Sequence, residues 1–274
     1  MNKTIQRFKG YLNTPSLWSH NSVQHLDQLD LLTRDIETSE IYVPDQIRLG
    51  KLVEHFVYYE LEQNPSFEML AKSLQVIKDK VTIGEIDCII KHLESFIHLE
   101  IVYKFYLYDA SIGALEIDKW IGPNRNDSLT QKLNKLTQKQ LPLISHPRTK
   151  ELLLDLGIDL LSLRQKILFK AQLYIPRALK NNSFEIINQN CITGFYIGID
   201  EYHSMHDQLF YMPQKLDWLI TPHLNVEWKD HAVFTKYVEK EINEKRSPLC
   251  WVKSPDGHVQ KIFIVFWVKK TKVR

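Results

Sequence analysis

The sequence predicts a mixed α/β protein, and three observations support this fold class. A strong helical pattern over residues 46–63 is followed by three runs rich in β-branched and aromatic residues. Only 9 glycines and 11 prolines interrupt the chain, which fits regular elements with compact joints better than a many-turned all-β sandwich. With 44% hydrophobic and 25% charged residues over 274 positions, the composition is that of a globular protein with a large core.

The first elements are expected to be helical. Leucines at 26, 29, 31 and 32 lie near helical spacing and predict one or two surface helices over 17–38. Pro44 and Asp45 then indicate a helix start, with Asp45 as a possible N-cap. Apolar residues at 47, 49, 52, 53, 56, 57 and 61 predict the helix over 46–63, and Asn64-Pro65 ends it.

Three strands should follow, at 74–77, 81–90 and 96–108, joined by short polar segments and therefore antiparallel. After a break at 122–124, Asp127 or Ser128 is expected to cap a helix that ends before Pro142. The remaining elements are expected as a helix at 149–161, a strand at 167–175, a strand at 194–199, an irregular aromatic stretch at 211–228, a helix at 234–245, and strands at 249–253 and 259–268.

This order predicts one domain with additions at both ends. Residues 1–44 would form an N-terminal helical extension, 45–180 the core, and 181–274 a mixed α/β C-terminal elaboration packed on that core. The core would then consist of a helix, three strands, one or two helices and a strand.

Several protein classes are excluded by the sequence. No apolar run approaches the ~20 residues of a membrane helix, so no membrane association is expected. No long apolar stretch follows Lys3, Arg7 and Lys9, so a secretory signal is not expected. The cysteines at 88, 191 and 250 are odd in number and far apart, which favours buried residues in a reducing compartment. We expect a cytoplasmic protein.

The distribution of charge suggests a polyanionic partner. The net charge is only +2, but residues 119–150 hold seven basic residues and one acid, Asp127. Such a local excess attracts nucleic acid, although a solvated helix face that happens to be basic explains it equally well. The candidate phosphate contacts in this segment are Arg125, Lys132, Lys135 and Lys139.

Acidic residues occur at positions that suggest a metal site. Glu54 borders the buried stripe of the helix over 46–63. Strand alternation places Glu85 and Asp87 on one face of the second strand, and His98, Glu100 and Lys104 on one face of the third. Carboxylates that converge repel one another, and oxygen ligands suit Mg²⁺ or Mn²⁺. The alternative is the solvent face of an antiparallel sheet that carries cross-strand ion pairs; burial of Asp87 and Glu100 discriminates between the two.

The sequence resembles one known protein superfamily and, more closely, one known protein family. The order of elements, with Glu on the first helix, Asp on the second strand and Glu then Lys on the third, resembles the PD-(D/E)XK nuclease superfamily, whose core is restriction-endonuclease-like. The strings RLGKLVEHF, TIGEIDCII, HLEIVYKFYL, GPNRNDSLTQKLNKL and QLPL more closely resemble a family of uncharacterised bacterial proteins, domain of unknown function family 1853.

The superfamily resemblance implies a nuclease that hydrolyses phosphodiester bonds. It implies Mg²⁺ or Mn²⁺ at Asp87 and Glu100, Glu54 as the helix carboxylate, Lys104 as the catalytic lysine, and nucleic acid, DNA ahead of RNA, as the partner. One departure is that Val102 stands two residues after Glu100, where the superfamily has its lysine. Lys104 is four residues on, with its Cα ~13 Å from that of Glu100 along a regular strand. The alternative is therefore a non-catalytic nucleic-acid-binding or protein-interaction module on the same fold. The sequence leaves the oligomeric state open.

Overall fold

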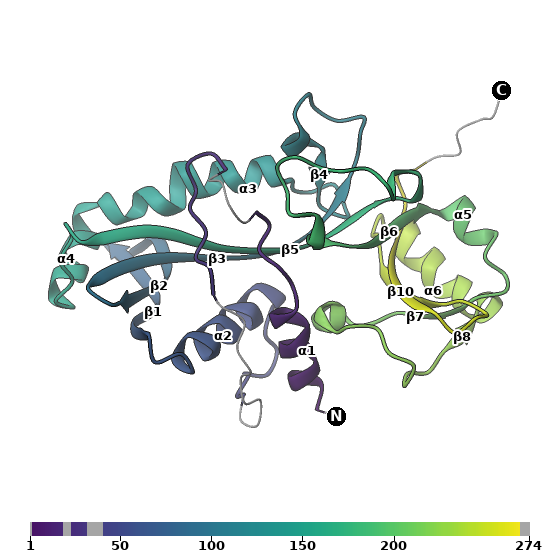
Figure 1. Cartoon of the computed structure of the whole chain (residues 1–274), viewed down its shortest axis with the longest axis horizontal. Coiled ribbons are helices and arrows are strands. Elements are labelled where there is room, and N and C mark those ends of the chain that lie inside the picture. The colour runs from purple at the N-terminus through teal and green to yellow at the C-terminus, as the bar shows by residue number, and fades with distance from the viewer. Residues whose placement is uncertain (1, 19–22, 32–40, 269–274) are drawn as a thin grey trace. The chain divides into compact units, whose positions relative to one another are not determined.

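The computed structural model describes residues 2–18, 23–31 and 41–268 (Figure 1). The chain divides into two compact units, each built from separate segments. Unit 1 comprises Met1–Thr14, Lys104–Leu129 and Ala171–Arg274, and unit 2 comprises Pro15–Tyr103 and Thr130–Lys170. The expected core over 45–180 thus contributes residues to both units.

Unit 2 is a sheet with helices on its two sides, in which the β1–β2 and β2–β3 pairs are antiparallel, whereas β3 and β5 both run from unit 2 into unit 1. Helix α2 lies against β1, and Figure 1 shows α3 and α4 on the other side of the sheet. The strands are hydrogen-bonded in the order β1-β2-β3-β5. Its elements are α2 (Leu49–Glu62), β1 (Phe67–Lys78), β2 (Val81–His92), β3 (Ser95–Tyr108), α3 (Leu129–Lys135), a π turn (Leu136–Gln140), a 3₁₀ turn (Leu141–Ser145), α4 (Pro147–Asp155) and β5 (Leu163–Pro176).

Unit 1 has a mixed sheet in the order β5-β6-β10-β9-β7-β8, with β4 paired to β3. Strand β6 is parallel to both β5 and β10, and the other pairs are antiparallel. Its further elements are α1 (Lys3–Leu12), β4 (Trp120–Ile121), β6 (Ile192–Gly198), α5 (Ile199–His203), β7 (Leu209–Tyr211), β8 (Lys229–Asp230), α6 (His231–Asn243), β9 (Leu249–Lys253) and β10 (Val259–Val265), with 3₁₀ turns at Glu116–Lys119, Arg177–Leu179, Gln189–Cys191 and Lys215–Leu219.

The predicted α/β class is confirmed: the described residues form ten strands and six α-helices. The helix over 46–63 is α2, although its N-cap is Arg48 and the expected cap Asp45 lies in a turn before it. Strand β1 is 12 residues long where four were expected, because Met69–Lys72 lack a clear alternation. The helix expected at 149–161 is α4, which ends at Asp155, and β5 begins before 167.

The helix predicted over 17–38 is wrong for the described residues 17–18 and 23–31; residues 19–22 and 32–38 lie outside the described part. The leucines there are buried against β5 through an extended backbone rather than through a helix face. Leu17 N–H donates to the Phe169 carbonyl at 2.7 Å, and Leu29 N–H to the Ile167 carbonyl at 2.8 Å. Tertiary pairing to a strand over 130 residues away has overridden the local pattern.

The first helix, α1, is fixed to unit 1 by a buried carboxylate and a close backbone contact. Asp217, 1% exposed, accepts hydrogen bonds from Arg7 Nε and Nη2 at 2.8 and 2.6 Å and from Lys3 Nζ at 2.9 Å. On the same helix, a Cβ added at Gly10 would lie 1.9 Å from the carbonyl oxygen of Leu219. Glycine at position 10 is therefore what lets the helix reach this surface.

We expect Gly10→Ala to destabilise the protein by about 2–3 kcal/mol. The added methyl group would clash with a backbone carbonyl, which cannot move aside as a flexible side chain can. Gly50→Ala in α2 is the control, because nothing lies within 4 Å of its added Cβ. That change should stabilise by about 0.5–1 kcal/mol through the helix propensity of alanine. Urea denaturation measures both, and equal shifts would contradict the packing of α1.

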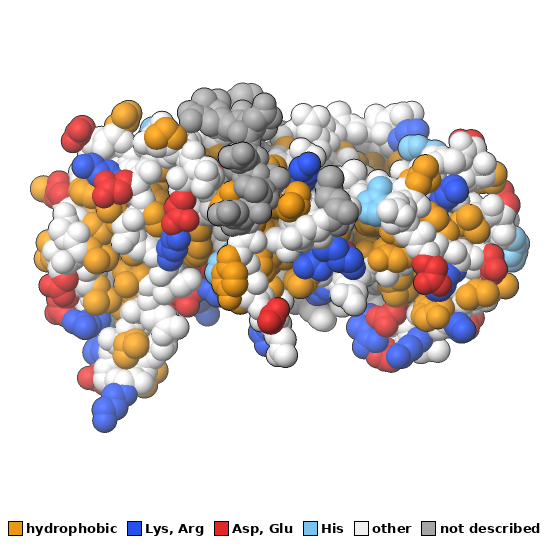
Figure 2. All heavy atoms as spheres, turned by 90° about the horizontal axis from the view of Figure 1, so that it is seen from below, with side chains coloured by type: hydrophobic (Ala, Val, Ile, Leu, Met, Phe, Trp, Pro, Cys, Tyr) orange, Lys and Arg blue, Asp and Glu red, His pale blue; other side chains and the backbone are white. Residues whose placement is uncertain are grey.

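The expectation of buried cysteines is confirmed, because Cys88, Cys191 and Cys250 are all fully buried. Within the described residues, the structure has no helix of the length and apolar character that a bilayer crossing requires. Seen from the side on which α2 lies, acidic and basic side chains are interspersed, and neither sign dominates this face (Figure 2).

Candidate functional site

The sheet of unit 2 is distorted at Asp87. The β1–β2 ladder pairs Lys72 with Cys88 and Leu74 with Ile86, so that Ser73 lies opposite Asp87. Ser73 has a φ of 46°, a left-handed conformation that is strained for a residue other than glycine. The Asp87 carbonyl instead accepts a hydrogen bond from the Tyr58 hydroxyl of α2 at 2.7 Å. A tyrosine thus takes the place of a ladder partner at this position.

The distortion also breaks the alternation of side chains along both strands. Ile86 and Ile89 are three residues apart, yet both pack in one cluster with Leu153 and Ile158. Ala71 and Leu74 of β1, also three apart, pack against the same cluster. Regular strands would place each pair on opposite faces. The expectation that Glu85 and Asp87 share one face agrees with the closeness of their carboxylates, but the alternation does not continue to Ile89, which packs with Ile86.

The carboxylate of Asp87 acts within the sheet itself. The β2–β3 ladder begins at Cys88 opposite Leu99, which aligns Asp87 with Glu100. Just beyond the ladder, Asp87 Oδ2 accepts the backbone N–H of Ile101 at 2.8 Å. The side chain therefore continues the hydrogen bonding where the two backbones separate, and a carboxylate is held between the strands.

Three carboxylates meet at this distortion. One oxygen each of Glu54, Glu85 and Asp87 lies within 4.8 Å of the others, a spacing at which they could ligate one cation. Lys51, one turn before Glu54 on α2, pairs with Glu54 Oε2 at 2.7 Å and with Glu85 Oε1 at 2.5 Å. We call Glu54, Glu85, Asp87 and Lys51 the acidic cluster.

Burial and mutual repulsion perturb these acids. Burial raises the pKa of Asp87 to about 7, and the charge of Glu100 adds to the shift, while the hydrogen bond from Ile101 opposes it. Burial also raises the pKa of Glu54, against the opposing effect of Lys51. Burial lowers the pKa of Lys51, but its ion pairs with Glu54 and Glu85 outweigh this and the net shift is upward. A strongly raised carboxyl pKa at a charged cluster is typical of functional sites.

Glu100 is fully buried and held by hydrogen bonds to both of its oxygens. Oε1 is 3.0 Å from His98 Nε2, and Oε2 accepts from Gln140 Nε2. Gln165 fixes the direction of the histidine bond: its amide nitrogen donates to the Leu141 carbonyl at 2.7 Å and lies 3.1 Å from His98 Nδ1. Since an NH₂ group only donates, Nδ1 accepts its hydrogen bond, and Nε2–H donates to Glu100 Oε1.

Gln140 reaches Glu100 from the π turn that follows α3. Its Oε1 accepts from Lys132 Nζ at 2.8 Å, which leaves its amide nitrogen directed at Glu100. The wider π turn rotates this residue relative to an α-helical position, and such turns often occur at functional sites. Lys132 also lowers the pKa of Asp87 by its charge, a smaller effect than burial and the acids.

The structure brings together three of the four predicted catalytic residues, all within unit 2. Asp87 is 9% and Glu100 0% exposed, and the side chain of Glu54 is 12% exposed. This burial argues against the alternative of a solvated strand face, since such acids would be open to water. Lys104 instead belongs to unit 1, where its Nζ pairs with Asp127 Oδ2 at 2.5 Å.

The four predicted phosphate contacts have different surroundings. Arg125 of unit 1 pairs with Asp109 at 2.7 Å and lies 4.8 Å from the centroid of the Trp267 ring. Lys132 supports Gln140, whereas Lys135 and Lys139 are exposed on α3 and the π turn of unit 2. Lys135 and Lys139 are thus accessible to a polyanion.

Sequence reasoning missed Lys51, Gln140 and Gln165, and it named Glu85 and His98 only as neighbours on a strand face. Lys51 lies three residues before Glu54, a spacing that brings two side chains together on a helix. That signal was present in the sequence. The contacts of Gln140 and Gln165 depend on segments 40 and 67 residues away from their partners, and no local pattern encodes them.

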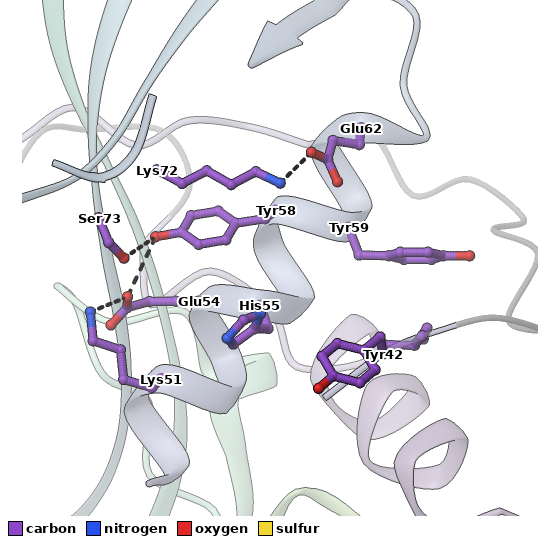
Figure 3. A pocket seen from close by; sticks show the side chains of 10 residues that line it. Tyr42, Lys51, Glu54, His55, Tyr58, Tyr59, Glu62, Lys72 and Ser73 are labelled. Carbon is purple, nitrogen blue, oxygen red and sulfur yellow. Dashed lines mark hydrogen bonds and ion pairs between the residues drawn. The ribbon is translucent and has the colours of Figure 1, made fainter. Parts of the chain in front are cut away.

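A pocket of about 360 Å³ lies on the α2 side of the acidic cluster (Figure 3). The cluster forms one wall through Lys51 and Glu54. Figure 3 shows the Tyr58 hydroxyl directed at Ser73 and Glu54, with His55, Tyr59 and Tyr42 around the remainder. The lining residues are Ile41, Tyr42, Lys51, Glu54, His55, Tyr58, Tyr59, Glu62, Lys72 and Ser73.

Fold and site define a mixed α/β protein in which buried carboxylates, a lysine and an aromatic-lined pocket meet at a distorted strand. A comparison with family models places the chain more narrowly. The model described as "Domain of unknown function (DUF1853)" matches residues 3–268, and the chain belongs to this family. No curated protein and no solved structure matches the chain.

Proposed function

We propose that the protein is a metal-dependent nuclease that hydrolyses phosphodiester bonds of nucleic acid. The single observation that carries the proposal is Asp87, which is buried at a distorted strand between Glu54, Glu85 and Glu100. We further propose that α2, β1–β3, α3 and β5 form a restriction-endonuclease-like core. The buried cysteines suit the reducing cytoplasm, which we propose as the location.

The donor set fits a hard divalent cation. All candidate ligands are carboxylate oxygens, which Mg²⁺ and Mn²⁺ prefer to nitrogen or sulfur. The raised pKa of Asp87 shows that its charge is poorly compensated. A cation held by Asp87 with Glu54 and Glu85, or with Glu100 as the sequence implies, would offset that repulsion and act as a Lewis acid toward phosphate and water.

The chain's own residues supply the remaining functions. Glu54 and Asp87 would position the attacking water opposite the leaving oxygen of the phosphodiester. Lys51, whose side chain is 45% exposed and lines the pocket, would stabilise the extra negative charge that develops on phosphate. His98 and Gln140 would keep Glu100 oriented by donating to its two oxygens.

We expect the purified wild-type chain to cut labelled single- or double-stranded DNA or RNA oligonucleotides in 5 mM Mg²⁺ or Mn²⁺, and not in excess EDTA. Cleavage is measured by the appearance of shorter labelled fragments on a denaturing gel. A preparation of Glu54→Gln purified identically is the control for contaminating nucleases, because that change removes a proposed ligand. Equal cleavage by both preparations, or none on any substrate, would contradict the proposal.

The alternative is a non-catalytic nucleic-acid-binding module, and the position of Lys104 favours it. The lysine implied to be catalytic pairs with Asp127 instead of with the acidic cluster. Such a protein would bind oligonucleotides through Lys135 and Lys139 without cutting them. Binding of the same oligonucleotides in a native-gel mobility shift, without cleavage in the experiment above, would select this alternative.

A further inference from the structure

The pocket beside the acidic cluster has features beyond those that hydrolysis requires. Its volume of about 360 Å³ is within the usual range of small-ligand sites, roughly 300–1,000 Å³. It therefore accommodates a group of about the size of one nucleoside. Because Lys51 and Glu54 belong both to the pocket and to the acidic cluster, a ligand seated here lies next to the proposed reaction site.

Aromatic side chains dominate the pocket on the side away from Ser73. Tyr42, His55 and Tyr59 surround this part of the pocket in Figure 3. Tyr42 is 82% exposed, so its ring is open to contact with a ligand. Flat aromatic surfaces bind nucleobases by stacking.

Charged groups border the same space. Lys72 Nζ lies 5.5 Å from the centroid of the Tyr58 ring and pairs with Glu62, and Lys51 lies at the opposite, cluster side. Both lysine side chains are more than 40% exposed. Each can therefore contact a phosphate that flanks a bound base. Aromatic rings beside exposed lysines match a nucleotide better than they match a purely apolar ligand.

We propose that this pocket binds one unpaired base, next to the phosphate that the acidic cluster cuts, so that the substrate is a single strand or a frayed end. The inference rests on the proposed function and adds the substrate class. Bases within a duplex are stacked and paired, and they reach such a pocket only if extruded. Among the described residues of this face, acidic and basic side chains are mixed (Figure 2), which fits contact with one or two nucleotides better than contact with a long duplex backbone.

The test is a binding experiment that does not depend on turnover. A 12-nucleotide single strand with a central 2-aminopurine is titrated into the Asp87→Asn protein in 5 mM Mg²⁺. Stacking of this base on a tyrosine quenches its fluorescence. We expect saturable quenching, binding at least tenfold tighter than to the matching duplex, and about a tenfold loss with Tyr42→Ala or Tyr59→Ala, in line with about 1–3 kcal/mol per stacked base.

Two variants serve as controls. Tyr42→Phe keeps the ring and should bind as the parent does. Tyr237→Ala removes a tyrosine that is 42% exposed on α6 in unit 1, and it should have no effect. Circular dichroism of each variant verifies folding, and Tyr42, being so exposed, is a site where truncation leaves the core intact.

The outcomes separate the two proposals. Quenching that disappears in both alanine variants supports the base pocket, whether or not the wild-type protein cuts. Cleavage by the wild type together with equal affinity for single strand and duplex, unchanged in both alanine variants, overturns the pocket and leaves the nuclease proposal standing. Binding of neither form, with no cleavage, overturns both.

Discussion

Asp87→Asn is expected to abolish cleavage and at the same time stabilise the metal-free protein. Activity should fall at least about 100-fold, because the substitution removes the charge of the central ligand. The free energy of unfolding should rise by about 2–4 kcal/mol at pH 8 in EDTA, since each unit of pKa shift corresponds to about 1.4 kcal/mol. Asparagine still accepts the Ile101 N–H through its oxygen, so that hydrogen bond is retained.

The gain in stability should depend on pH in a defined direction. The pKa of Asp87 rises from 3.8 in the unfolded chain to about 7 in the folded chain. Between these values the folded state binds more protons, so the wild type loses stability as pH rises from about 4 to about 7. The advantage of Asp87→Asn should be absent near pH 4 and complete above pH 7.

Urea denaturation across this range measures the effect. Asp79→Asn is the matched control, because Asp79 is exposed in the β1–β2 turn with a φ of 50° that asparagine also accepts. It should change stability by less than about 0.5 kcal/mol at every pH. A destabilised Asp87→Asn protein at pH 8 would show that the carboxylate is satisfied as it stands and needs no cation.

Lys51→Met should lower activity about 100-fold, whereas Lys104→Met should retain most of it. Lys51 pairs with two acids of the cluster, and its loss leaves them repelling both each other and the phosphate. Lys104 and Asp127 are 34% and 41% exposed, and such a surface pair contributes only about 0–1 kcal/mol to stability.

Initial cleavage rates of the two methionine variants, with Lys51→Arg as the conservative variant, decide the question. Arginine keeps the charge but has a different shape, so partial recovery is expected. If Lys104→Met were inactive and Lys51→Met nearly normal, the role implied by the superfamily resemblance would be correct and our assignment wrong. A pH–rate profile of Lys51→Met should also shift upward, because the pKa of Glu54 rises when its ion pair is lost.

Much of this arrangement could be predicted from sequence because it depends on local patterns. Helical periodicity placed Glu54 at the edge of the buried stripe of α2, and short polar joints predicted the hairpin that aligns Asp87 with Glu100. These features depend on neighbours a few residues apart. They need no knowledge of the remainder of the chain.

The features that sequence reasoning missed depend on long-range pairing or on backbone strain. Ser73 is an ordinary serine in sequence, and only the sheet reveals its left-handed conformation. That distortion breaks the period-two alternation of both strands, so that Ile86 and Ile89 lie on one face although they are three residues apart. Leu17 and Leu29 likewise lie in a segment that looks helical until β5 is present to pair with them. Their burial is a property of the fold rather than of their own pattern.

The most direct test of the acidic cluster is a calorimetric Mn²⁺ titration of wild type and Asp87→Asn, performed at pH 6 and pH 8 with a non-cleavable phosphorothioate strand present. We expect binding in the wild type and at least tenfold weaker binding in the variant. We also expect proton release on binding that is larger at pH 6 than at pH 8, because Asp87, with a pKa of about 7, must lose its proton to bind the metal. Identical titrations of the two proteins, or no binding to either, would contradict a metal site at Asp87.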